Sequence, residues 1–177
     1  KVNYREAYNS FACNGIMFNH ESPIRGETFV TKKIIQGLIR IKNDNQKKLF
    51  LGNLYSKRDW GHAGDYVEAM WKMLQQKKPN DYVIATGKTF TIKEFVNKSA
   101  NKIGLKIKWV GKGIKEKAIN LKNGKVLIEC KNRYFRPVEV DYLKGNAQRA
   151  KKILKWKPKI SIDTLIDEMI KHEENLS

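Results

Sequence analysis

Apolar side chains recur along the chain at two spacings, and each spacing predicts a different element. Repeats three or four residues apart mark helix faces, whereas alternation and short apolar runs bounded by turn residues mark strands. We predict helices over 28–42, 65–74, 91–103, 146–154 and 161–170, after an opening helix end at 4–9. We predict strands over 12–18, 49–51, 81–86, 105–109 and 126–130. The segments 19–28 and 111–125 are expected to be loops, and the alternation of helix and strand predicts an α/β fold.

The run from Arg58 to Asp65 carries the first chemical signal. Asp65 and Glu68 have the spacing of a capping box, which predicts that the run before them is a loop. Behind the box lies a predicted apolar helix face of Val67, Met70, Trp71 and Leu74. A guanidinium on such a loop suits a phosphate or diphosphate, because it offers paired planar donors and keeps its charge. The alternative is a local salt bridge between Arg58 and Asp59.

The charge of the chain raises a different possibility. The 177 residues have a formal net charge of +18, which suggests a polyanionic partner such as nucleic acid. The excess is mostly Lys, it is spread over every segment, and it accompanies many Asn and Ile, a combination that AT-rich codons produce. Lys151, Lys152 and Lys155 fall on the polar back of a predicted helix, where a solvated face is ordinary. We therefore do not expect nucleic-acid binding.

The apolar runs and the cysteines indicate the compartment. No run approaches the roughly 18 apolar residues of a membrane span, and the first residues lack the apolar stretch of a signal peptide. We therefore expect a cytoplasmic protein that does not enter the membrane. Cys13 and Cys130 are expected to be free buried thiols in that reducing compartment. Neither has a second Cys or His at a metal-ligand spacing, so we expect no metal site.

The catalytic motifs of nucleotide-dependent enzymes are missing from these residues. Gly111-Lys112-Gly113 begins like a dinucleotide fingerprint, but Glu116 stands where the third glycine is needed and no helix cap follows. The sequence contains no Tyr-x-x-x-Lys pair and no nucleophile with an adjacent base. The residues alone therefore favour binding over catalysis.

Longer ordered matches point to a family. They lie at 3–8, 18–34, 51–54, 58–67, 71, 81–87, 133–140 and 156–158. The second reads Phe-Asn-His-Glu-Ser-Pro-Ile-Arg-Gly-Glu-Thr-Phe-Val-Thr-Lys-Lys-Ile, and the seventh reads Arg-Tyr-Phe-Arg-Pro-Val-Glu-Val. Together they resemble GDP-mannose 4,6-dehydratase, a family of extended short-chain dehydrogenases/reductases, over essentially the whole chain.

This resemblance implies an activity and a division of labour. The family dehydrates GDP-mannose to GDP-4-keto-6-deoxymannose, with NADP as an internal redox cofactor, so it consists of lyases. Its glycine-rich cofactor turn, catalytic Thr and Glu, and Tyr-x-x-x-Lys would all lie N-terminal to Lys1. The resemblance therefore implies a C-terminal fragment that carries substrate-binding and some cofactor-contact residues but no catalytic residues. Such a fragment would be inactive alone, and the complete enzyme would be a homo-oligomer.

The resemblance also implies a fold and a domain division. It predicts the C-terminal part of a Rossmann-like NADP-binding domain, intertwined with a smaller α/β substrate-binding domain. Segments 1–22 and 49–90 would belong mostly to the first domain, and 23–48 and 91–177 mostly to the nucleotide-sugar-binding domain. The alternatives are a sister nucleotide-sugar dehydratase or epimerase and, from another class, a basic nucleic-acid-binding module.

Two positions match cofactor contacts of the family. The resemblance assigns His20 and Arg25 to NADP, on the loop after the first predicted strand. The alternative for His20 is a turn histidine bonded to the backbone. His62 matches no ligand position and is interpreted as a structural turn residue.

Seven positions match substrate contacts: Asn19, Val30, Lys33, Gly52, Arg58, Arg136 and Glu139. Within this set the two arginines would clamp the diphosphate, and Glu139 would hold the ribose or base. The alternatives are an Asx turn for Asn19, a surface lysine for Lys33, a strand-end turn for Gly52 and an Arg136 salt bridge for Glu139.

Overall fold

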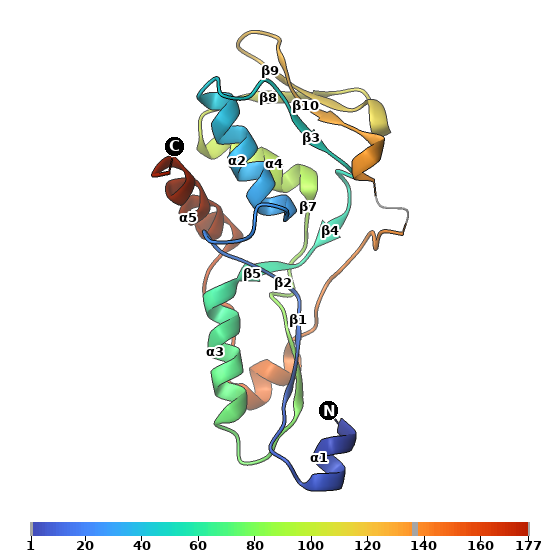
Figure 1. Ribbon diagram of the computed structural model, residues 1–177, viewed down its shortest axis with the longest axis vertical. Helices are drawn as coiled ribbons and strands as arrows, with labels where there is room; N and C mark the ends of the chain where they lie inside the picture. The colour runs from blue at the N-terminus through green and yellow to red at the C-terminus, as the bar shows by residue number, and fades with distance from the viewer. Residues whose placement is uncertain (1, 136–137, 177) are drawn as a thin grey trace.

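The protein forms two lobes joined by a narrow waist (Figure 1). The computed structural model describes residues 2–135 and 138–176. The helices are α1 Val2–Tyr8, α2 Val30–Lys42, α3 Ala63–Leu74, α4 Ile92–Lys102 and α5 Ile162–Glu174. The short helical turns are η1 Gly113–Lys115, η2 Asn132–Tyr134 and the π-helix η3 Ala150–Leu154. The strands are β1 Asn14–Met17, β2 Asn19–Glu21, β3 Leu49–Leu51, β4 Lys57–Arg58, β5 Trp60–His62, β6 Asp81–Ile84, β7 Phe90–Thr91, β8 Ile107–Val110, β9 Lys117–Asn120 and β10 Val126–Cys130.

The upper lobe is a four-stranded sheet with three helices packed against it (Figure 1). The strand order is β3-β10-β9-β8, with β3 parallel to β10 and the other pairs antiparallel. Apolar side chains of α2, α4 and α5 face the sheet and one another, as their spacing predicts. The predicted capping box of Thr91 and Glu94 is confirmed at the start of α4.

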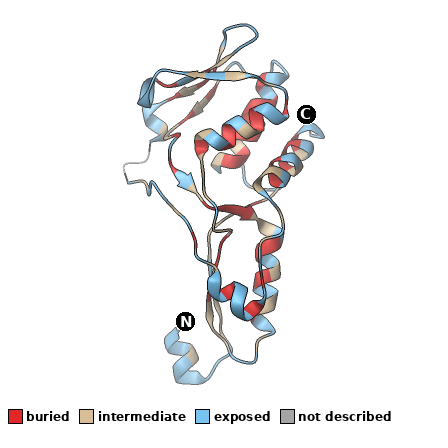
Figure 2. Ribbon diagram, turned by 180° about the vertical axis from the view of Figure 1, so that it is seen from behind, coloured by how far each residue is buried: buried red, intermediate tan, exposed pale blue. Residues whose placement is uncertain are grey.

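The lower lobe is smaller and has its own hydrophobic core. Strands β1 and β6 pair in parallel, and α3 and η3 pack against them. The core consists of Tyr66, Ala69, Met73, Tyr82, Ile84, Ala150, Leu154 and Trp156. In Figure 2 buried and exposed stretches alternate along α3, while α1 is exposed almost throughout.

Two short strand pairs form the waist. Strand β2 pairs in parallel with β5, and β4 pairs antiparallel with β7. The sequence had predicted loops at 19–28, before the helix at Asp65, and at 111–125, and these predictions are wrong in part because each segment contains a strand. The partners of β2, β4 and β5 lie far away in the sequence. Strands of two to four residues also leave no readable alternation.

The start and the buried face of α3 also differ from the prediction. His62 caps the helix, because its ring accepts a hydrogen bond from the Gly64 N–H at 3.0 Å. The Asp65 carboxylate is buried and accepts hydrogen bonds from the Lys159 and Ile160 N–H groups at 2.9 and 3.0 Å. The Asp65–Glu68 capping box is therefore wrong. The predicted apolar face is also wrong: Val67, Met70, Trp71 and Leu74 are exposed.

The alternation of helix and strand that predicts an α/β fold is confirmed, and burial of the two cysteines is confirmed for one of them. The fold is α/β, and both cysteines are free thiols, Cys130 buried and Cys13 half-buried. Within residues 2–135 and 138–176, no helix has the length and apolar character needed to cross a bilayer.

Candidate functional site

A cavity of about 660 Å³ lies at the waist, beneath the sheet of the upper lobe. Its walls come from β2, the start of α2, the end of β3, β4 and the turn η2. Six of the seven predicted substrate residues line it: Asn19, Val30, Lys33, Gly52, Arg58 and Glu139. The seventh, Arg136, lies outside the described residues. The fold therefore gathers on one cavity residues that are far apart in the sequence.

Strand geometry directs side chains into this cavity. Successive residues on a strand point to opposite sides, so Arg58 and Trp60 face the cavity while Asp59 between them faces away. Asn19 pairs in register with Trp60 across β2 and β5. In the described part of the chain, no hydrogen bond joins the Asn19 side chain to another residue, so the Asx turn is not formed.

Arg58 is held by an acidic partner and two carbonyl groups. Its Nη2 donates to Glu139 Oε1 at 3.0 Å, and its Nη1 donates to the carbonyl oxygens of Val140 and Lys57 at 2.6 and 2.9 Å. Both charged side chains are mostly buried, at 13% and 21% exposed. The pair therefore presents to the cavity a fixed guanidinium and a carboxylate whose second oxygen has no hydrogen-bond partner among residues 2–135 and 138–176.

Asp59 does not pair with Arg58, so the local salt bridge weighed as an alternative is wrong. Its carboxylate is fully buried and accepts four hydrogen bonds. Oδ1 accepts from the Thr86 N–H at 2.8 Å and the Thr86 hydroxyl at 2.6 Å. Oδ2 accepts from the N–H groups of Gly87 at 2.9 Å and Gly145 at 3.1 Å. Asp59 thus fastens the strand that carries Arg58 to two other segments.

Lys33 lies against an aromatic ring on the cavity wall. Its ammonium is 3.7 Å from the centre of the Tyr134 ring. Arg133 donates to the Tyr134 hydroxyl at 2.6 Å, and its guanidinium carbon lies 4.7 Å from the same ring centre. Burial lowers the pKa of the Lys33 ammonium below its ordinary 10.5. Lys33 is therefore not an ordinary surface lysine.

Gly52 allows a close approach, but the approaching group is the chain's own backbone. A Cβ at this position would stand 2.2 Å from the Tyr134 carbonyl oxygen and 2.7 Å from its carbonyl carbon. Only a residue without a side chain fits there. Gly52 therefore seats η2, and with it Tyr134, against the end of β3.

Glu21 was not singled out from the sequence, although it lines the cavity. Its carboxylate is 2% exposed, accepts a hydrogen bond from the Thr31 hydroxyl at 2.6 Å, and lies 3.2 Å from Arg25 Nε. Burial raises the pKa of this carboxyl. Trp60, Arg133 and Tyr134 were also missed as site residues. The available signal was their place within the matched segments.

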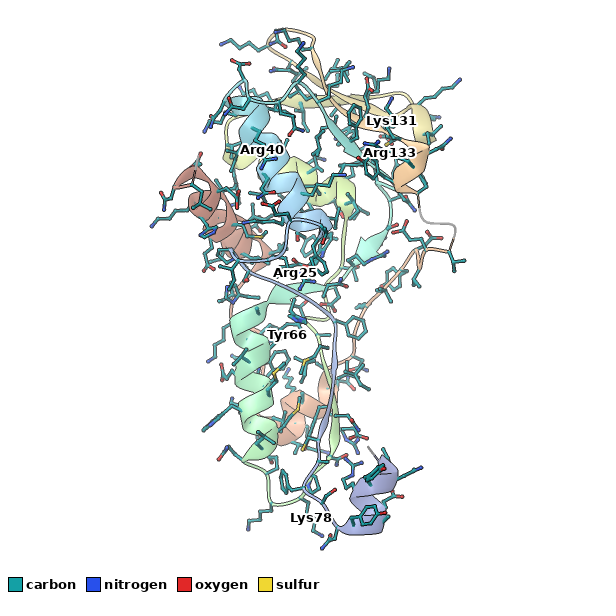
Figure 3. All side chains as sticks on the ribbon, in the orientation of Figure 1. Arg25, Arg40, Tyr66, Lys78, Lys131 and Arg133 are labelled. Carbon is teal, nitrogen blue, oxygen red and sulfur yellow. The ribbon has the colours of Figure 1, made fainter. Side chains whose placement is uncertain are left out.

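The two predicted cofactor residues lie beside the cavity but do not line it. His20 Nδ1 is 3.0 Å from the Phe18 carbonyl oxygen, which is the backbone-bonded arrangement weighed as the alternative. Its ring packs at 5.3 Å on Tyr66, whose buried hydroxyl has no hydrogen-bond partner in the described residues. The Arg25 guanidinium stacks on Phe29 at 3.3 Å. Figure 3 places Arg25 and Tyr66 near the waist and Arg133 higher, beside the sheet.

A second cavity of about 530 Å³ lies in the lower lobe and holds none of the predicted ligand residues. It is lined mainly by the segments 85–87, 144–148 and 156–158. In the described part of the chain, no three His, Cys, Asp or Glu side chains gather as they would around a metal ion. The cavity at the waist is therefore the candidate site.

Two solved structures show which known proteins share this fold. RMD from Pseudomonas aeruginosa, solved with NADPH, superposes with a TM-score of 0.79 at 18% identity, covering 99% of this chain and 52% of that one. The dTDP-glucose 4,6-dehydratase of Bacillus anthracis, solved with NAD, gives 0.76 at 19% identity, covering 98% and 48%. The chain therefore shares the Rossmann-like fold of these two proteins.

Sequence comparison defines the family. Residues 1–169 match the family model for GDP-mannose 4,6 dehydratase. The GDP-mannose 4,6 dehydratase of Dictyostelium discoideum is 55% identical over 169 residues, covering 96% of this chain and 48% of the relative. The human enzyme of that name is 52% identical over 169 residues, covering 96% and 45%. The chain belongs to the GDP-mannose 4,6-dehydratase family, as the sequence predicts, and spans about half the length of these curated relatives.

Proposed function

We propose that this chain is the nucleotide-sugar-binding part of a GDP-mannose 4,6-dehydratase. The observation that carries this proposal is the cavity at the waist, where six residues matched to substrate contacts meet. The relatives at about half identity bear the name of that enzyme. The nucleic-acid alternative is not favoured, because many lysines are committed to acidic partners, as in the Lys48–Glu129, Lys98–Asp163 and Lys102–Asp167 ion pairs.

In this proposal the chain's residues bind and orient the substrate. The Arg58 guanidinium faces the negative diphosphate, and Glu139 both holds Arg58 and offers its second carboxylate oxygen to a ribose hydroxyl. Asn19 supplies an uncommitted amide from β2. Fixing the nucleotide in this way holds the hexose in one place, which is the part of catalysis that positioning provides. The proton-transfer residues would come from the half of the relatives that this chain does not match.

The residues beside the cavity fit a nicotinamide cofactor. The Tyr66 hydroxyl is a buried polar atom without a hydrogen-bond partner in the described residues, and its ring packs on His20 of the predicted cofactor loop. When bound, NADP would supply the hydride acceptor and donor for a dehydration with internal redox. His20 and Arg25 would hold it. Several points remain predictions. They are the preference for NADP over NAD, the lyase reaction, the homo-oligomeric state of the complete enzyme, the cytoplasmic location and the division of the chain into two domains.

Isothermal titration of the complete chain tests the proposal. We expect heat of binding with GDP-mannose and none with UDP-glucose or dTDP-glucose at the same concentration.

Arg58→Met should weaken GDP-mannose binding by about tenfold or more, since a hydrogen bond to a charged group contributes about 1.5–3 kcal/mol. The matched control is Arg40→Met, which changes an exposed arginine of α2. Binding of a UDP or dTDP sugar alone would move the assignment to a sister enzyme, and absence of binding to every sugar nucleotide would refute it.

A further inference from the structure

The sheet of the upper lobe has one face covered by helices and one open face. Helices α2, α4 and α5 pack on the face that carries Trp109 and Ala118. Successive residues of a strand alternate between the faces, so Lys108, Val110 and Lys117 belong to the open face. Val110 and Lys117 stand opposite each other in register, and all three residues are exposed. Figure 1 shows the helices of the upper lobe on the other side of these strands.

Positive charge is concentrated around the open face. Segment 105–131, which forms β8, β9 and β10 with their connections, contains eight lysines and two glutamates. Its net charge is +6 in 27 residues, whereas the other 150 residues share the remaining +12. Every lysine of the segment is exposed. A codon bias raises the lysine content throughout a chain, so it does not account for this local excess.

The two glutamates of the segment do not neutralise the excess. Glu116 is buried and pairs with Lys93 of α4 at 2.5 Å. Glu129 pairs with Lys48 at 2.8 Å, and the Lys131 ammonium stands 3.7 Å from it. Each glutamate therefore already has a lysine from outside the segment. Among the described residues, the charge of the open face is left without an equal number of acids.

Exposed aliphatic side chains stand among these lysines at both ends of β9. Leu121, which is 58% exposed, begins the hairpin between β9 and β10 and precedes Lys122. Ile114, which is 41% exposed, lies on η1 between Lys112 and Lys115. Proteins that lie on a bilayer combine these two features, because lysines attract anionic headgroups and aliphatic side chains enter the boundary with the acyl chains.

The chemistry of the open face favours a lipid surface over a nucleic acid. Every cation of the segment is a lysine, which acts as a point charge, whereas arginine supplies the paired donors typical of nucleic-acid recognition. Single-stranded nucleic acids also stack their bases on aromatic side chains. The Phe50 ring adjoins Glu129 on the next strand, but the Lys131 ammonium already lies 5.2 Å from its centre.

We propose that the open face of the upper sheet binds the surface of an anionic lipid bilayer. Lys108 and Lys117 lie at the headgroups, and Leu121 lies at the boundary between the headgroups and the acyl chains. In this mode the chain lies on the bilayer and does not cross it. None of these three residues lines the cavity at the waist, so the site of the proposed function stays free. The inference therefore does not depend on that function.

Co-sedimentation of the complete chain with lipid vesicles tests the inference. We expect binding at low salt to vesicles of phosphatidylcholine that contain about one-third phosphatidylglycerol, and at least about tenfold weaker binding to pure phosphatidylcholine. Binding should fall as the salt concentration rises, because the lysines are exposed and screened. Equal binding to the two kinds of vesicle would overturn the inference.

Variants locate the contact. Lys108→Gln with Lys117→Gln should weaken vesicle binding by about tenfold or more, since each lysine near an anionic surface contributes about fivefold. The matched control is Lys77→Gln with Lys78→Gln, which changes two exposed lysines of the lower lobe. Figure 3 shows Lys78 at the opposite end of the molecule from Lys131. Unchanged binding in the first variant, or equal loss in the control, contradicts the inference.

Leu121→Ser separates a lipid surface from a nucleic acid. We expect vesicle binding to weaken by about threefold or more, because the variant removes an apolar side chain from the acyl boundary. The Lys108→Gln, Lys117→Gln variant should still bind GDP-mannose as the unaltered chain does, which shows that it is folded. Tighter binding to a duplex DNA oligonucleotide than to the anionic vesicles, with no effect of Leu121→Ser, would make a nucleic acid the partner and overturn the inference.

Discussion

At the scale of single residues, Asp59 shows how a buried carboxylate can set the position of a neighbouring ligand residue. It accepts four hydrogen bonds and is fully buried, while Arg58 and Trp60 on either side face the cavity. Changing Asp59 would therefore act on the strand as a whole. The effect should appear in folding stability as well as in ligand binding.

We expect Asp59→Asn to lower the free energy of unfolding by roughly 3 kcal/mol. In this variant an NH₂ group, which is itself a donor, replaces one carboxylate oxygen. About two buried N–H groups then lose their acceptor. For a chain of this size the melting temperature should fall by roughly 6–12 °C. Thermal unfolding, monitored by circular dichroism, measures this change in melting temperature. Asp44→Asn is the control, because Asp44 is exposed at φ 58°, a conformation that Asn tolerates. Equal melting of the two variants would show that the Asp59 bonds contribute little.

The partners of Asp59 explain why the sequence could identify Arg58 but not its support. Resemblance picks out residues by their own type and place, so Asn19, Lys33, Arg58 and Glu139 could all be named before the structure. Three of the four groups that donate to Asp59 are backbone N–H groups, those of Thr86, Gly87 and Gly145, which have no sequence signature. The Arg58–Glu139 pair likewise joins residues 81 positions apart. Such contacts appear only after folding.

At the scale of elements, Gly52 links the end of β3 to the turn η2. We expect Gly52→Ala to displace η2, because its Cβ would stand 2.2 Å from the Tyr134 carbonyl oxygen. Overpacking of this kind costs about 1–3 kcal/mol. Binding of GDP should weaken by about tenfold or more, since Tyr134 and Arg133 leave their places on the cavity wall. Titration calorimetry measures the affinity, and circular dichroism measures the stability.

The control for this change is Gly26→Ala, where an added Cβ would meet only the Phe29 ring at an ordinary 3.5 Å. That variant should bind GDP as the unaltered chain does. If Gly52→Ala bound GDP normally, η2 would have no part in nucleotide binding.

Helix α1 is attached to the lower lobe by few contacts and should detach in acid. None of its residues is buried, and Arg5 donates to both Asp81 oxygens at 2.8 and 3.2 Å. These bonds lower the pKa of the Asp81 carboxyl from 3.8 to about 2. A carboxyl with a depressed pKa stabilises the folded state above its unfolded pKa, and that contribution is lost as the pH falls through the folded value. Attachment of α1 should therefore weaken between pH 3.8 and about 2.

Carbon chemical shifts of residues 3–8, followed by NMR from pH 5 to pH 2, measure the helix directly. Asp81→Asn should lose the helical shifts already at neutral pH, because the amide cannot pair with Arg5 as a charged partner. Helical shifts that persist in Asp81→Asn would show that other contacts hold α1.

The elements also show which local signals can be trusted. Thr91 and Glu94 form the capping box that their spacing predicts, because both partners lie within one turn. Asp65 and Glu68 have the same spacing, yet Asp65 binds the backbone at Lys159 and Ile160, and Glu68 pairs with Lys72 and Lys159. The Asp65 carboxylate binds backbone N–H groups of a distant segment, and His62 caps the helix instead. Capping patterns therefore predict a helix start well and its cap less well.

At the scale of the whole molecule, the two lobes differ in how completely they cover their apolar surface. The upper lobe packs three helices against a four-stranded sheet. The lower lobe has only two parallel strands, although parallel sheets are usually covered on both faces. One stripe of α3 is uncovered, with Val67 at 60%, Trp71 at 61% and Leu74 at 61% exposure. Ile16 on β1 is 55% exposed as well.

This uncovered stripe explains why helical periodicity pointed to the wrong face of α3. The buried set, Tyr66, Ala69 and Met73, has the same spacing of three and four residues as the exposed set. Periodicity shows that apolar residues share a face, but it cannot rank two apolar faces on one helix. Large aliphatic and aromatic side chains on both faces are expected where a helix has neighbours on both sides.

An uncovered stripe of this kind should make the isolated chain associate with itself. Contiguous exposed apolar patches drive association because joining them removes apolar area from water, at about 25 cal/mol per Å². We expect sedimentation velocity to show association that grows with concentration for the unaltered chain. The double change Trp71→Lys and Leu74→Lys should give a monomer with nearly the same melting temperature, since both positions are exposed. The same two changes at buried positions, Tyr66→Lys and Met73→Lys, should unfold the lower lobe instead. A monomer at every concentration for the unaltered chain would show that the exposed stripe does not drive association. Unfolding of the Trp71→Lys, Leu74→Lys variant would show that the stripe is part of the folded core.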